Sequence, residues 1–362
     1  MKEYILQNRV LSVLARQGWN TTGIERLQSS KGSGLLNPPV IRYYVSHDGQ
    51  RTQVAVKVVE QEPRLLFRRL YRECGHASEE QLNLFDRCCP FLSINKMPER
   101  EGKFYCGLND IIKPYVPRMY GVGYSDKKLL LVMEDLSYCE CMDAIDNPLR
   151  WQFADVMQII KTLALFHHTE IYYEEMFPSW NDSDNWELIA NFLAEFNGSM
   201  AQYAQLTKER KISSIVEEYI RNLEQYEHCL RQYRTIYIHN DFNIRNICLS
   251  RQEQKIKVYD WEFLDKKNPI MDLVDLFLSL ATEYLEKENL DRLLKMYMEQ
   301  LSEYGEDNLG SLSLKEQIYY NTLKFSATRM NMYLLFYIWR KTPYIVRMCR
   351  NLVRLLSYCS HR

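Results

Sequence analysis

The sequence of 362 residues lacks the features that mark membrane-spanning and secreted proteins. No apolar run approaches the roughly 18 residues that a helix needs to cross a bilayer, and Met332–Trp339 is among the longest. The first residues, Met1-Lys2-Glu3-Tyr4, have neither the basic region nor the apolar core of a signal peptide. We therefore expect a cytoplasmic protein without stable membrane insertion.

The ten cysteines do not form a disulfide framework or a zinc site. Those at residues 88–89 and 139–141 lack paired Cys-x-x-Cys spacing, so we expect reduced thiols. The net charge of -1 gives no field that would attract nucleic acid. We interpret the acid-free stretch at 340–362 as a solvated basic helix face. These features leave the oligomeric state open.

One short loop carries the strongest functional signal. Residues 239–246 read His-Asn-Asp-Phe-Asn-Ile-Arg-Asn between apolar strands, and Asp260 ends a later strand. Asp and Asn are common in turns, where they bond to nearby backbone. Transfer of a phosphoryl group, however, needs an acceptor for a hydroxyl proton and oxygen ligands for a metal. Asp241, Asn246 and Asp260 supply these groups in the order His-x-Asp-x-x-x-x-Asn and then Asp that kinases use.

The N-terminal part of the sequence predicts a small sheet. Two strands are expected between Ile24 and Ser46, around a loop at residues 29–34 where Ser33 and two glycines would let backbone N–H groups approach phosphates. In the next strand, residues 54–59, alternation separates the valines at even positions from Lys57. A lysine in this Val-Ala-x-Lys context is predicted to reach nucleotide phosphates and to pair with a helix glutamate.

Several glutamates could be that partner. A helical stretch at residues 64–89 offers Glu73, and we interpret residues 64–99 as an insertion. A later helix, which leads into a strand that begins near Pro117, offers Glu101. Glu101 is the preferred partner of Lys57, and Glu73 is the alternative.

An apolar strand at residues 129–136 ends in two acids. In a kinase this strand leads into the segment that binds adenine. Met133 would lie behind the purine, and the backbones of Glu134 and Leu136 would supply hydrogen bonds. The side chains of Glu134 and Asp135 are not needed for this role.

From Pro148 onward the pattern becomes helical. Apolar residues recur at three- and four-residue steps up to His167, and either His167 or His168 is expected to be a hydrogen-bonded core histidine. Two helices are expected at 184–233, and others near 270–287, 289–304, 313–340 and 343–358. Asp272 and Asp275 lie at a helix start, where acids suit the helix dipole. One of them is expected to brace the loop at 239–246.

These residues resemble the kinase-like small-molecule phosphotransferases, the group of aminoglycoside phosphotransferases, choline and ethanolamine kinases and ecdysteroid-kinase-like proteins. Most of that group has Gly at the position of Asn240. The run His-Asn-Asp at 239–241 is more similar to choline and ethanolamine kinases. The resemblance implies an α+β, two-lobe, protein-kinase-like fold with a small antiparallel-sheet N-lobe and a mostly helical C-lobe. We place the N-lobe at 1–136 and the C-lobe at 137–362, with the catalytic loop at 237–249. Asp-Trp-Glu at 260–262, in place of Asp-Phe-Gly, argues against a protein kinase.

The resemblance also implies roles for the residues. Asp241 would accept or orient the proton of a substrate hydroxyl, Asn246 and Asp260 would hold Mg²⁺, and His239 would prop the loop. Lys57, bridged to Glu101, would steady the phosphates of ATP or GTP. The expected activity is transfer of the γ-phosphate to a small hydroxylated molecule.

The acceptor stays open at this stage. Acids and aromatics interleaved within residues 140–187 would suit an amino-alcohol or an aminoglycoside. The acid-free C-terminus instead favours a neutral sugar or polyol. The alternative function is a pseudokinase or nucleotide-binding scaffold.

Overall fold

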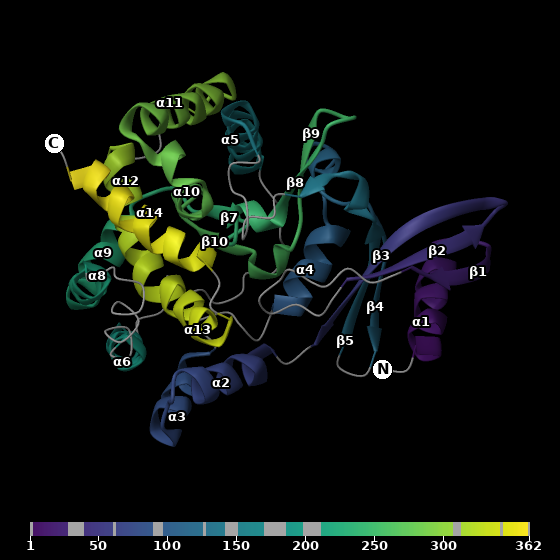
Figure 1. The fold of residues 1–362 in the computed structure, drawn as a ribbon, viewed down its shortest axis with the longest axis horizontal. Helices are drawn as coiled ribbons and strands as arrows, with labels where there is room; N and C mark the ends of the chain where they lie inside the picture. Colours follow the sequence, from purple (N-terminus) through teal and green to yellow (C-terminus); the bar gives the residue numbers. More distant parts are fainter. Residues whose placement is uncertain are drawn as a thin grey trace. The chain divides into compact units, whose positions relative to one another are not determined.

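The computed structural model describes residues 3–27, 40–60, 63–89, 97–125, 128–141, 151–169, 186–197, 211–306, 313–340 and 343–360 (Figure 1). The chain forms two compact units. Unit 1 contains Met1–Pro63, Asn95–Cys141 and Ile247–Glu262, and unit 2 contains Arg64–Ile94, Met142–Asn246 and Phe263–Arg362. The predicted α+β class is confirmed, because an antiparallel sheet dominates the N-terminal part and helices dominate the rest.

Unit 1 is built on a five-stranded antiparallel sheet in the order β1-β2-β3-β5-β4, and a three-stranded sheet in the order β6-β8-β9 accompanies it. Strands β3 and β5 are rich in β-branched and apolar residues, which suit a pleated surface. The elements of unit 1 are α1 (Glu3–Arg16), β1 (Thr21–Arg26), β2 (Ile41–His47), β3 (Gln50–Glu60), α4 (Met97–Cys106), η2 (Lys113–Tyr115), β4 (Met119–Ser125), β5 (Lys128–Glu134), η3 (Leu136–Tyr138), β6 (Glu140–Cys141), β8 (Ile247–Ser250), β9 (Lys255–Val258) and η6 (Trp261–Phe263).

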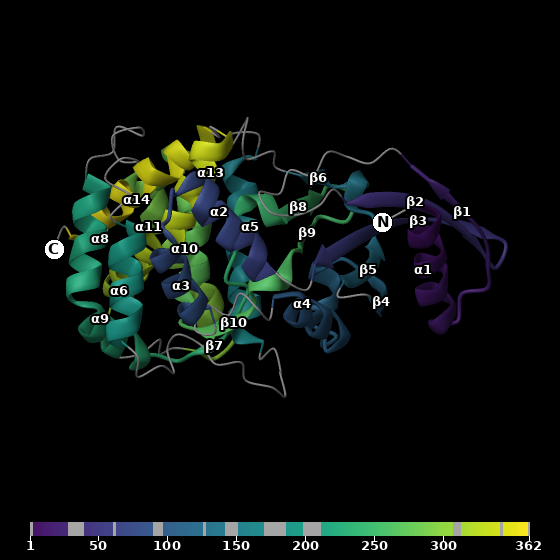
Figure 2. The same ribbon diagram turned by 90° about the horizontal axis from the view of Figure 1, so that it is seen from below.

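Helix α1 covers one face of the five-stranded sheet (Figure 2). Its apolar residues at positions 6, 10, 13 and 14 repeat at helical spacing, and they join Val54 and Val56 of β3 in one buried cluster. The helix approaches β4 closely, because a Cβ atom at either Gly121 or Gly123 would lie 2.5 Å from Val13. The two glycines of β4 therefore fix how tightly α1 packs.

The other face of the sheet turns toward α4. Lys57 follows Val56 on β3, so its side chain leaves the sheet on the side opposite to α1. There it meets Glu101 of α4. Because side chains of β3 point alternately to the two faces of the sheet, the face toward α1 is apolar and the face toward α4 is charged.

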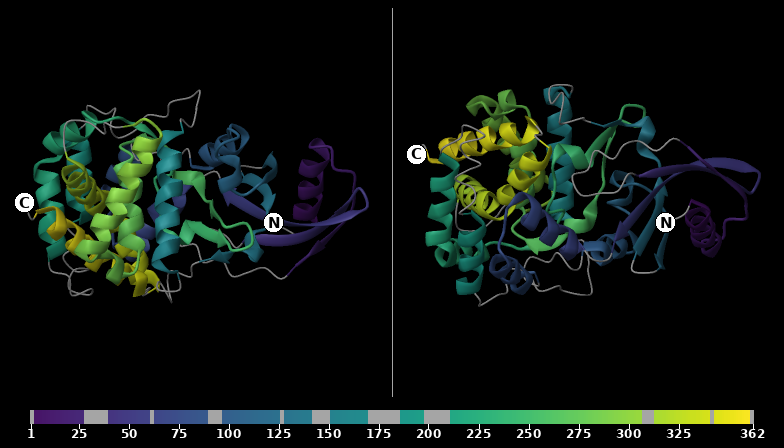
Figure 3. Two further views of the ribbon diagram at one scale, coloured as in Figure 1. Left: turned by 90° about the horizontal axis from the view of Figure 1, so that it is seen from above. Right: turned by 60° about the horizontal axis from the view of Figure 1, so that its bottom comes forward.

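Unit 2 is mostly helical and contains one two-stranded antiparallel sheet, β10-β7. Helix α10 is its centre, since every residue of α10 is buried, and it contacts α5, α12 and α14. Helices α5 and α11 lie side by side (Figure 3). The elements of unit 2 are α2 (Pro63–Cys74), α3 (Glu79–Cys88), α5 (Phe153–His168), α6 (Trp186–Asn197), α8 (Lys211–Arg221), α9 (Leu223–Arg231), β7 (Ile236–Ile238), η5 (Ile244–Asn246), β10 (Asp265–Lys267), α10 (Ile270–Ser279), η7 (Thr282–Leu285), α11 (Lys287–Glu303), α12 (Leu314–Phe325), η8 (Ser326–Met330), α13 (Asn331–Arg340) and α14 (Pro343–Ser360).

Residues 64–94 differ from the sequence prediction, which assigned them to the N-lobe. They belong to unit 2 because aromatic side chains of α2 and α3 pack on α6, with Tyr71 4.2 Å and Phe85 6.4 Å from Phe196 between ring centroids. The predicted single helical stretch is two helices, and Ser78 begins the second with a capping box. Conversely, residues 247–262, predicted as part of the C-lobe, belong to unit 1, because β8 pairs with β6.

The region at residues 184–233 holds three described helices where the sequence predicted two. Within the described residues, no helix is long and apolar enough to span a membrane. None of the cysteines whose side chains are described forms a disulfide.

Candidate functional site

Lys57 is the centre of a charged cluster in unit 1. Its Nζ atom lies 2.7 Å from a carboxylate oxygen of Glu101 and 2.5 Å from one of Asp260. A third carboxylate, that of Glu262, lies 3.7 Å away. Lys57 and Glu101 are both almost completely buried. Glu73, the alternative partner, is exposed and pairs with Arg69 on its own helix.

The cluster holds three acids and one lysine, which shift one another's pKa values. Burial by itself would lower the pKa of Lys57, but Asp260, Glu101 and Glu262 together hold it well above its usual range. Burial raises the pKa of Glu101, and the charge of Asp260 adds to that rise although Lys57 opposes it. Three carboxyl groups thus surround one ammonium group, and carboxylate oxygens are groups to which a cation can bind.

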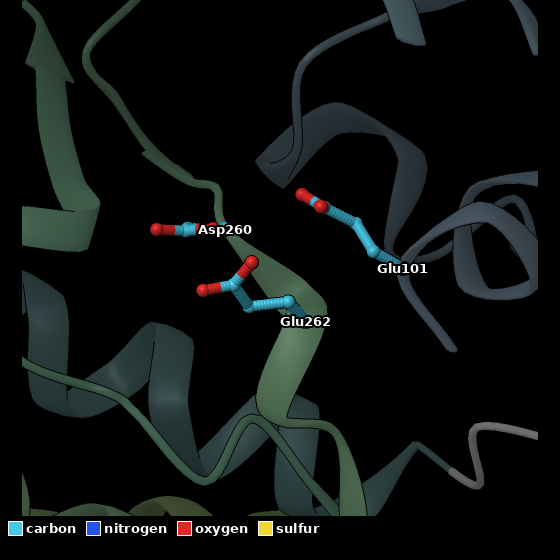
Figure 4. Close-up of side chains that lie close together, drawn as sticks. All are labelled: Glu101, Asp260 and Glu262. Carbon is cyan, nitrogen blue, oxygen red and sulfur yellow. The ribbon is translucent and has the colours of Figure 1, made fainter. Parts of the chain in front are cut away.

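The three acids come from two segments that the fold brings together (Figure 4). Glu101 lies on α4, whereas Asp260 and Glu262 follow β9. One ligand oxygen from each acid lies within 4.8 Å of the others, which is the arrangement of a metal-binding group. Asp260 has a positive φ of 69°, a strained conformation of the kind that concentrates at functional sites. Sequence reasoning named Asp260 as a metal ligand but gave Glu262 no role.

The segment after β5 differs from the prediction in one respect. Met133 is buried within β5, as the sequence indicates. The side chain of Glu134, predicted to have no task, accepts hydrogen bonds from the Arg118 N–H at 2.9 Å and from the Tyr138 hydroxyl at 2.6 Å. Asp135 is also buried and accepts a hydrogen bond from Arg42 at 3.0 Å. Both acids therefore anchor the backbone that follows the strand.

Leu136 begins the short helix η3 directly after these acids. Ser33 lies outside the described residues. The same holds for most of the acids and aromatics at 140–187 that bear on the acceptor.

Residues 237–246 of the predicted catalytic loop belong to unit 2. Asn246 donates from Nδ2 to Oδ2 of Asp241 at 2.7 Å and to the Asp241 carbonyl at 2.9 Å. The amide oxygen is therefore the atom with which Asn246 could ligate a cation. Asn243 donates to Oδ1 of Asp241 at 3.1 Å. The structure thus brings Asp241 and Asn246 together in unit 2, and Lys57, Glu101 and Asp260 together in unit 1.

Asp272 is the acid that braces this loop. Its two oxygens accept hydrogen bonds from the backbone N–H groups of His239 at 2.8 Å and Asn240 at 2.7 Å. His167 is the core histidine expected from the sequence, since its Nδ1 lies 2.7 Å from the Tyr297 hydroxyl and its Nε2 lies 3.6 Å from Asp272. A buried chain of polar contacts consequently holds the loop in place.

Asn240 has a backbone conformation that few residue types adopt readily. Its φ is 58°, in the left-handed region that Gly and Asn adopt more readily than other residues. Its Nδ2 donates to the carbonyl of Phe263 at 2.9 Å. The asparagine in place of glycine therefore keeps the backbone conformation and adds a contact.

Sequence reasoning missed two side chains that contact Asp241. The Nη1 atom of Arg329 lies 3.0 Å from Oδ1 of Asp241, and the Tyr333 hydroxyl lies 3.2 Å from the same atom. Arg329 and Tyr333 follow Asp241 by 88 and 92 positions in the sequence, and no local sequence pattern marks them. Asp275 is buried in the same unit, and burial and then the charge of Asp241 raise its pKa well above the usual range.

The sequence model of the ecdysteroid kinase-like family matches residues 103–309, more than half of the chain. The chain belongs to the ecdysteroid kinase-like family. The matched residues of this ecdysteroid kinase-like protein include Asp241, Asn246 and Asp260, and they exclude Lys57 and Glu101. The predicted resemblance is confirmed, and the chain is a small-molecule kinase-like protein.

Comparison of the ecdysteroid kinase-like chain with solved structures finds kinases at low similarity. An ethanolamine kinase of Plasmodium vivax aligns over 93% of this chain and 82% of its own, with 13% identity and a TM-score of 0.42. The PknI kinase domain of Mycobacterium tuberculosis aligns over 73% and 77%, with 12% identity and a TM-score of 0.32. No curated protein matches the sequence. Family membership therefore rests on the sequence model.

Proposed function

We propose that this ecdysteroid kinase-like protein transfers the γ-phosphate of ATP or GTP to a hydroxyl of a small molecule. The observation that carries the proposal is that each unit assembles its own share of the required groups. Unit 1 supplies a buried lysine among carboxylates, and unit 2 supplies an aspartate held by an asparagine. Little covalent chemistry falls to the protein in such a reaction, because alignment and charge neutralisation do most of the work.

The cluster in unit 1 fits the anionic end of a magnesium nucleotide. Lys57 would contact the phosphates while Glu101 fixes the direction of its ammonium group. Within unit 1, Asp260 and Glu262 offer carboxylate oxygens to a cation, and Mg²⁺ prefers oxygen ligands. When bound, Mg²⁺ would neutralise phosphate charge.

Asp241 would orient the acceptor hydroxyl and accept its proton. The contacts with Asn243 and Asn246 hold its carboxylate in one orientation, and Asp272 holds the loop backbone. Adenine or guanine would bind at Met133, with hydrogen bonds from the backbones of Glu134 and Leu136. The hydrogen bonds of Glu134 and Asp135 would hold that backbone in place.

The described charges favour a neutral acceptor over a cationic one. The Arg329 guanidinium lies beside Asp241, where a positively charged amine would otherwise be attracted. Lys267 lies 3.4 Å from the side-chain oxygen of Asn240, so a second cation is close to the loop. Burial lowers the pKa of Lys267 to about 8, and Lys324 and Arg329 contribute to the decrease although Asp265 opposes it. A sugar, polyol or other uncharged alcohol would therefore suit the surroundings of Asp241 better than an aminoglycoside or amino-alcohol.

A screen for phosphorylated products tests the proposal. Purified protein is incubated with Mg²⁺, ATP or GTP, and panels of sugars, nucleosides and hydroxylated amines, and products are detected by mass spectrometry. We expect a phosphate to be added to a neutral alcohol, and expect no product when EDTA is present. The scaffold alternative predicts binding of the magnesium nucleotide without any product. That outcome would overturn the proposed transfer reaction.

A further inference from the structure

The two oxygens of Asp241 have unequal surroundings in unit 2. Oδ1 receives three donors, from Asn243 at 3.1 Å, Arg329 at 3.0 Å and Tyr333 at 3.2 Å. Oδ2 receives one donor among the described residues, from Asn246 at 2.7 Å. A carboxylate oxygen offers about two lone-pair positions. Oδ1 is therefore saturated, and Oδ2 keeps one position for another donor.

Arg329 is itself held from three sides. One guanidinium nitrogen bonds to Asp241 and another to the carbonyl oxygen of Asn240. The guanidinium also lies 4.7 Å from the centroid of the Phe263 ring, in a cation–π contact. Burial alone would lower the pKa of Arg329, but the charges of Asp241 and Asp275 raise it. This side chain is a fixed cation whose planar group matches a carboxylate and an adjacent carbonyl.

Tyr333 extends the same contact. Its hydroxyl donates to Asp241 and receives a hydrogen bond from Arg245 at 3.2 Å. Burial, and then the charge of Asp241, hold the pKa of Tyr333 well above its usual range, so the hydroxyl keeps its proton. The donor that faces Oδ1 therefore does not change with pH in the neutral range.

The helix that carries both residues is locally altered. Between α12 and α13 the turn Ser326–Met330 is a π-helix, and Arg329 lies within it. Turns of this kind are rare in α-helices and are frequent at functional sites. The sequence prediction of one continuous helix at 313–340 does not contain this feature. Arg329 of the π turn and Tyr333, four residues later, both contact the same carboxylate oxygen, as residues at this spacing on one helix face can.

We infer that Arg329, presented by the π turn, is a positioning residue that occupies Oδ1 of Asp241 together with Tyr333, so that the acceptor hydroxyl meets Asp241 at Oδ2. The inference rests on the proposed function and deepens it. The hydroxyl proton passes to Oδ2 as the oxygen–phosphorus bond forms and the bond to the nucleoside diphosphate breaks. Arg329 does not contact the acceptor or the nucleotide in this account, and acts through Asp241.

Kinetics of Arg329 variants test the role. Arg329→Met should lower kcat on the order of 100-fold through misplacement of the base, with little change in KM for the nucleotide. Arg329→Lys keeps the charge but loses the planar guanidinium group, so its kcat should lie between that of Arg329→Met and that of the unmodified protein. Methylguanidinium in solution should restore part of the kcat of Arg329→Ala and none of that of Asp241→Asn. Arg354→Met, in an exposed ion pair with Glu286, is the matched control and should match the unmodified protein.

Unfolding of a double-variant cycle provides a readout that does not need turnover. Adding Arg329→Met to Asp241→Asn should lower the urea midpoint by less than adding it to the unmodified protein, because the contact is already lost. Additive midpoints, or normal kcat in Arg329→Met, would overturn the inference and leave the proposed function standing. No transfer to any acceptor by the unmodified protein would instead overturn the proposed function, and the cycle would still decide whether Arg329 holds Asp241.

Discussion

Replacing Lys57 by Met should destabilise unit 1 strongly. The substitution keeps an unbranched side chain of similar length but removes the ammonium that faces Glu101, Asp260 and Glu262. Lys57 and Glu101 are buried, with side-chain exposures of 7% and 1%. Removing one partner of a buried ion pair costs about 3–5 kcal/mol, since the other charge is left uncompensated. This is a large part of the total stability of a typical domain, about 5–15 kcal/mol.

A second substitution separates this electrostatic effect from lost packing. Adding Glu101→Gln to Lys57→Met removes one of the uncompensated charges, so the double variant should recover about 0.5–3 kcal/mol relative to Lys57→Met. Mg²⁺ should also raise the stability of Lys57→Met more than that of the unmodified protein, because the ammonium group no longer competes with Mg²⁺ for the three carboxylates.

Urea unfolding followed by tryptophan fluorescence measures these differences. Trp261 is buried in unit 1 and stacks on Phe104 with 3.9 Å between ring centroids, so its emission reports on the region next to the cluster. The reasoning would be refuted by a cost below about 1 kcal/mol for Lys57→Met. The reasoning would equally be refuted if adding Glu101→Gln to Lys57→Met lowered the stability further.

Three further predictions concern backbone conformation, titration and packing. Asn240→Gly should keep the loop intact and Asn240→Ala should cost about 1–2 kcal/mol, because φ is 58°; thermal unfolding of both variants compares them, and equal losses would contradict this reason. Asp275 has a raised pKa in the folded state, so its contribution to stability is present below the unfolded pKa and is lost as pH rises through the folded pKa. Asp275→Asn should therefore flatten the decline of stability with pH that urea unfolding measures from pH 4 to 8. An unchanged pH dependence in this variant would contradict the role of Asp275. Gly123→Ala should lower the melting temperature, because the new Cβ atom would lie 2.5 Å from Val13. Adding Val13→Ala should restore part of the loss. A still lower melting temperature in the double variant would show that α1 does not pack as described.

The sequence predicted the features that depend on local patterns. Strand alternation placed Lys57 away from the valines, and the helix at residues 97–106 places Glu101 beside it. The loop at 239–246 was recognisable because its spacing is set by chemistry within a few residues. Helix α1 was not predicted although Leu6, Val10 and Val13 repeat at helical spacing, so a signal was present there.

Other features had no local signal. Arg329 reaches Asp241 only through the tertiary packing of unit 2, and hydrophobic periodicity does not reveal the π turn that carries it. The assignment of residues 64–94 to unit 2 depends on contacts with α6, which follows about 100 residues later. Asp135 was recognised as a loop acid, but its burial against Arg42 follows from the pairing of β3 with β5 and the position of β2.

The most direct test of the account is the transfer of labelled γ-phosphate by the unmodified protein, Asp241→Asn and Asp260→Asn to one accepted alcohol. All three should have similar far-UV circular dichroism spectra. We predict transfer by the unmodified protein, a loss of about 10²–10⁴-fold in Asp241→Asn, and no transfer above background in Asp260→Asn at any Mg²⁺ concentration. Near-normal transfer by either variant would contradict the assignment of these two aspartates as the base and the metal ligand.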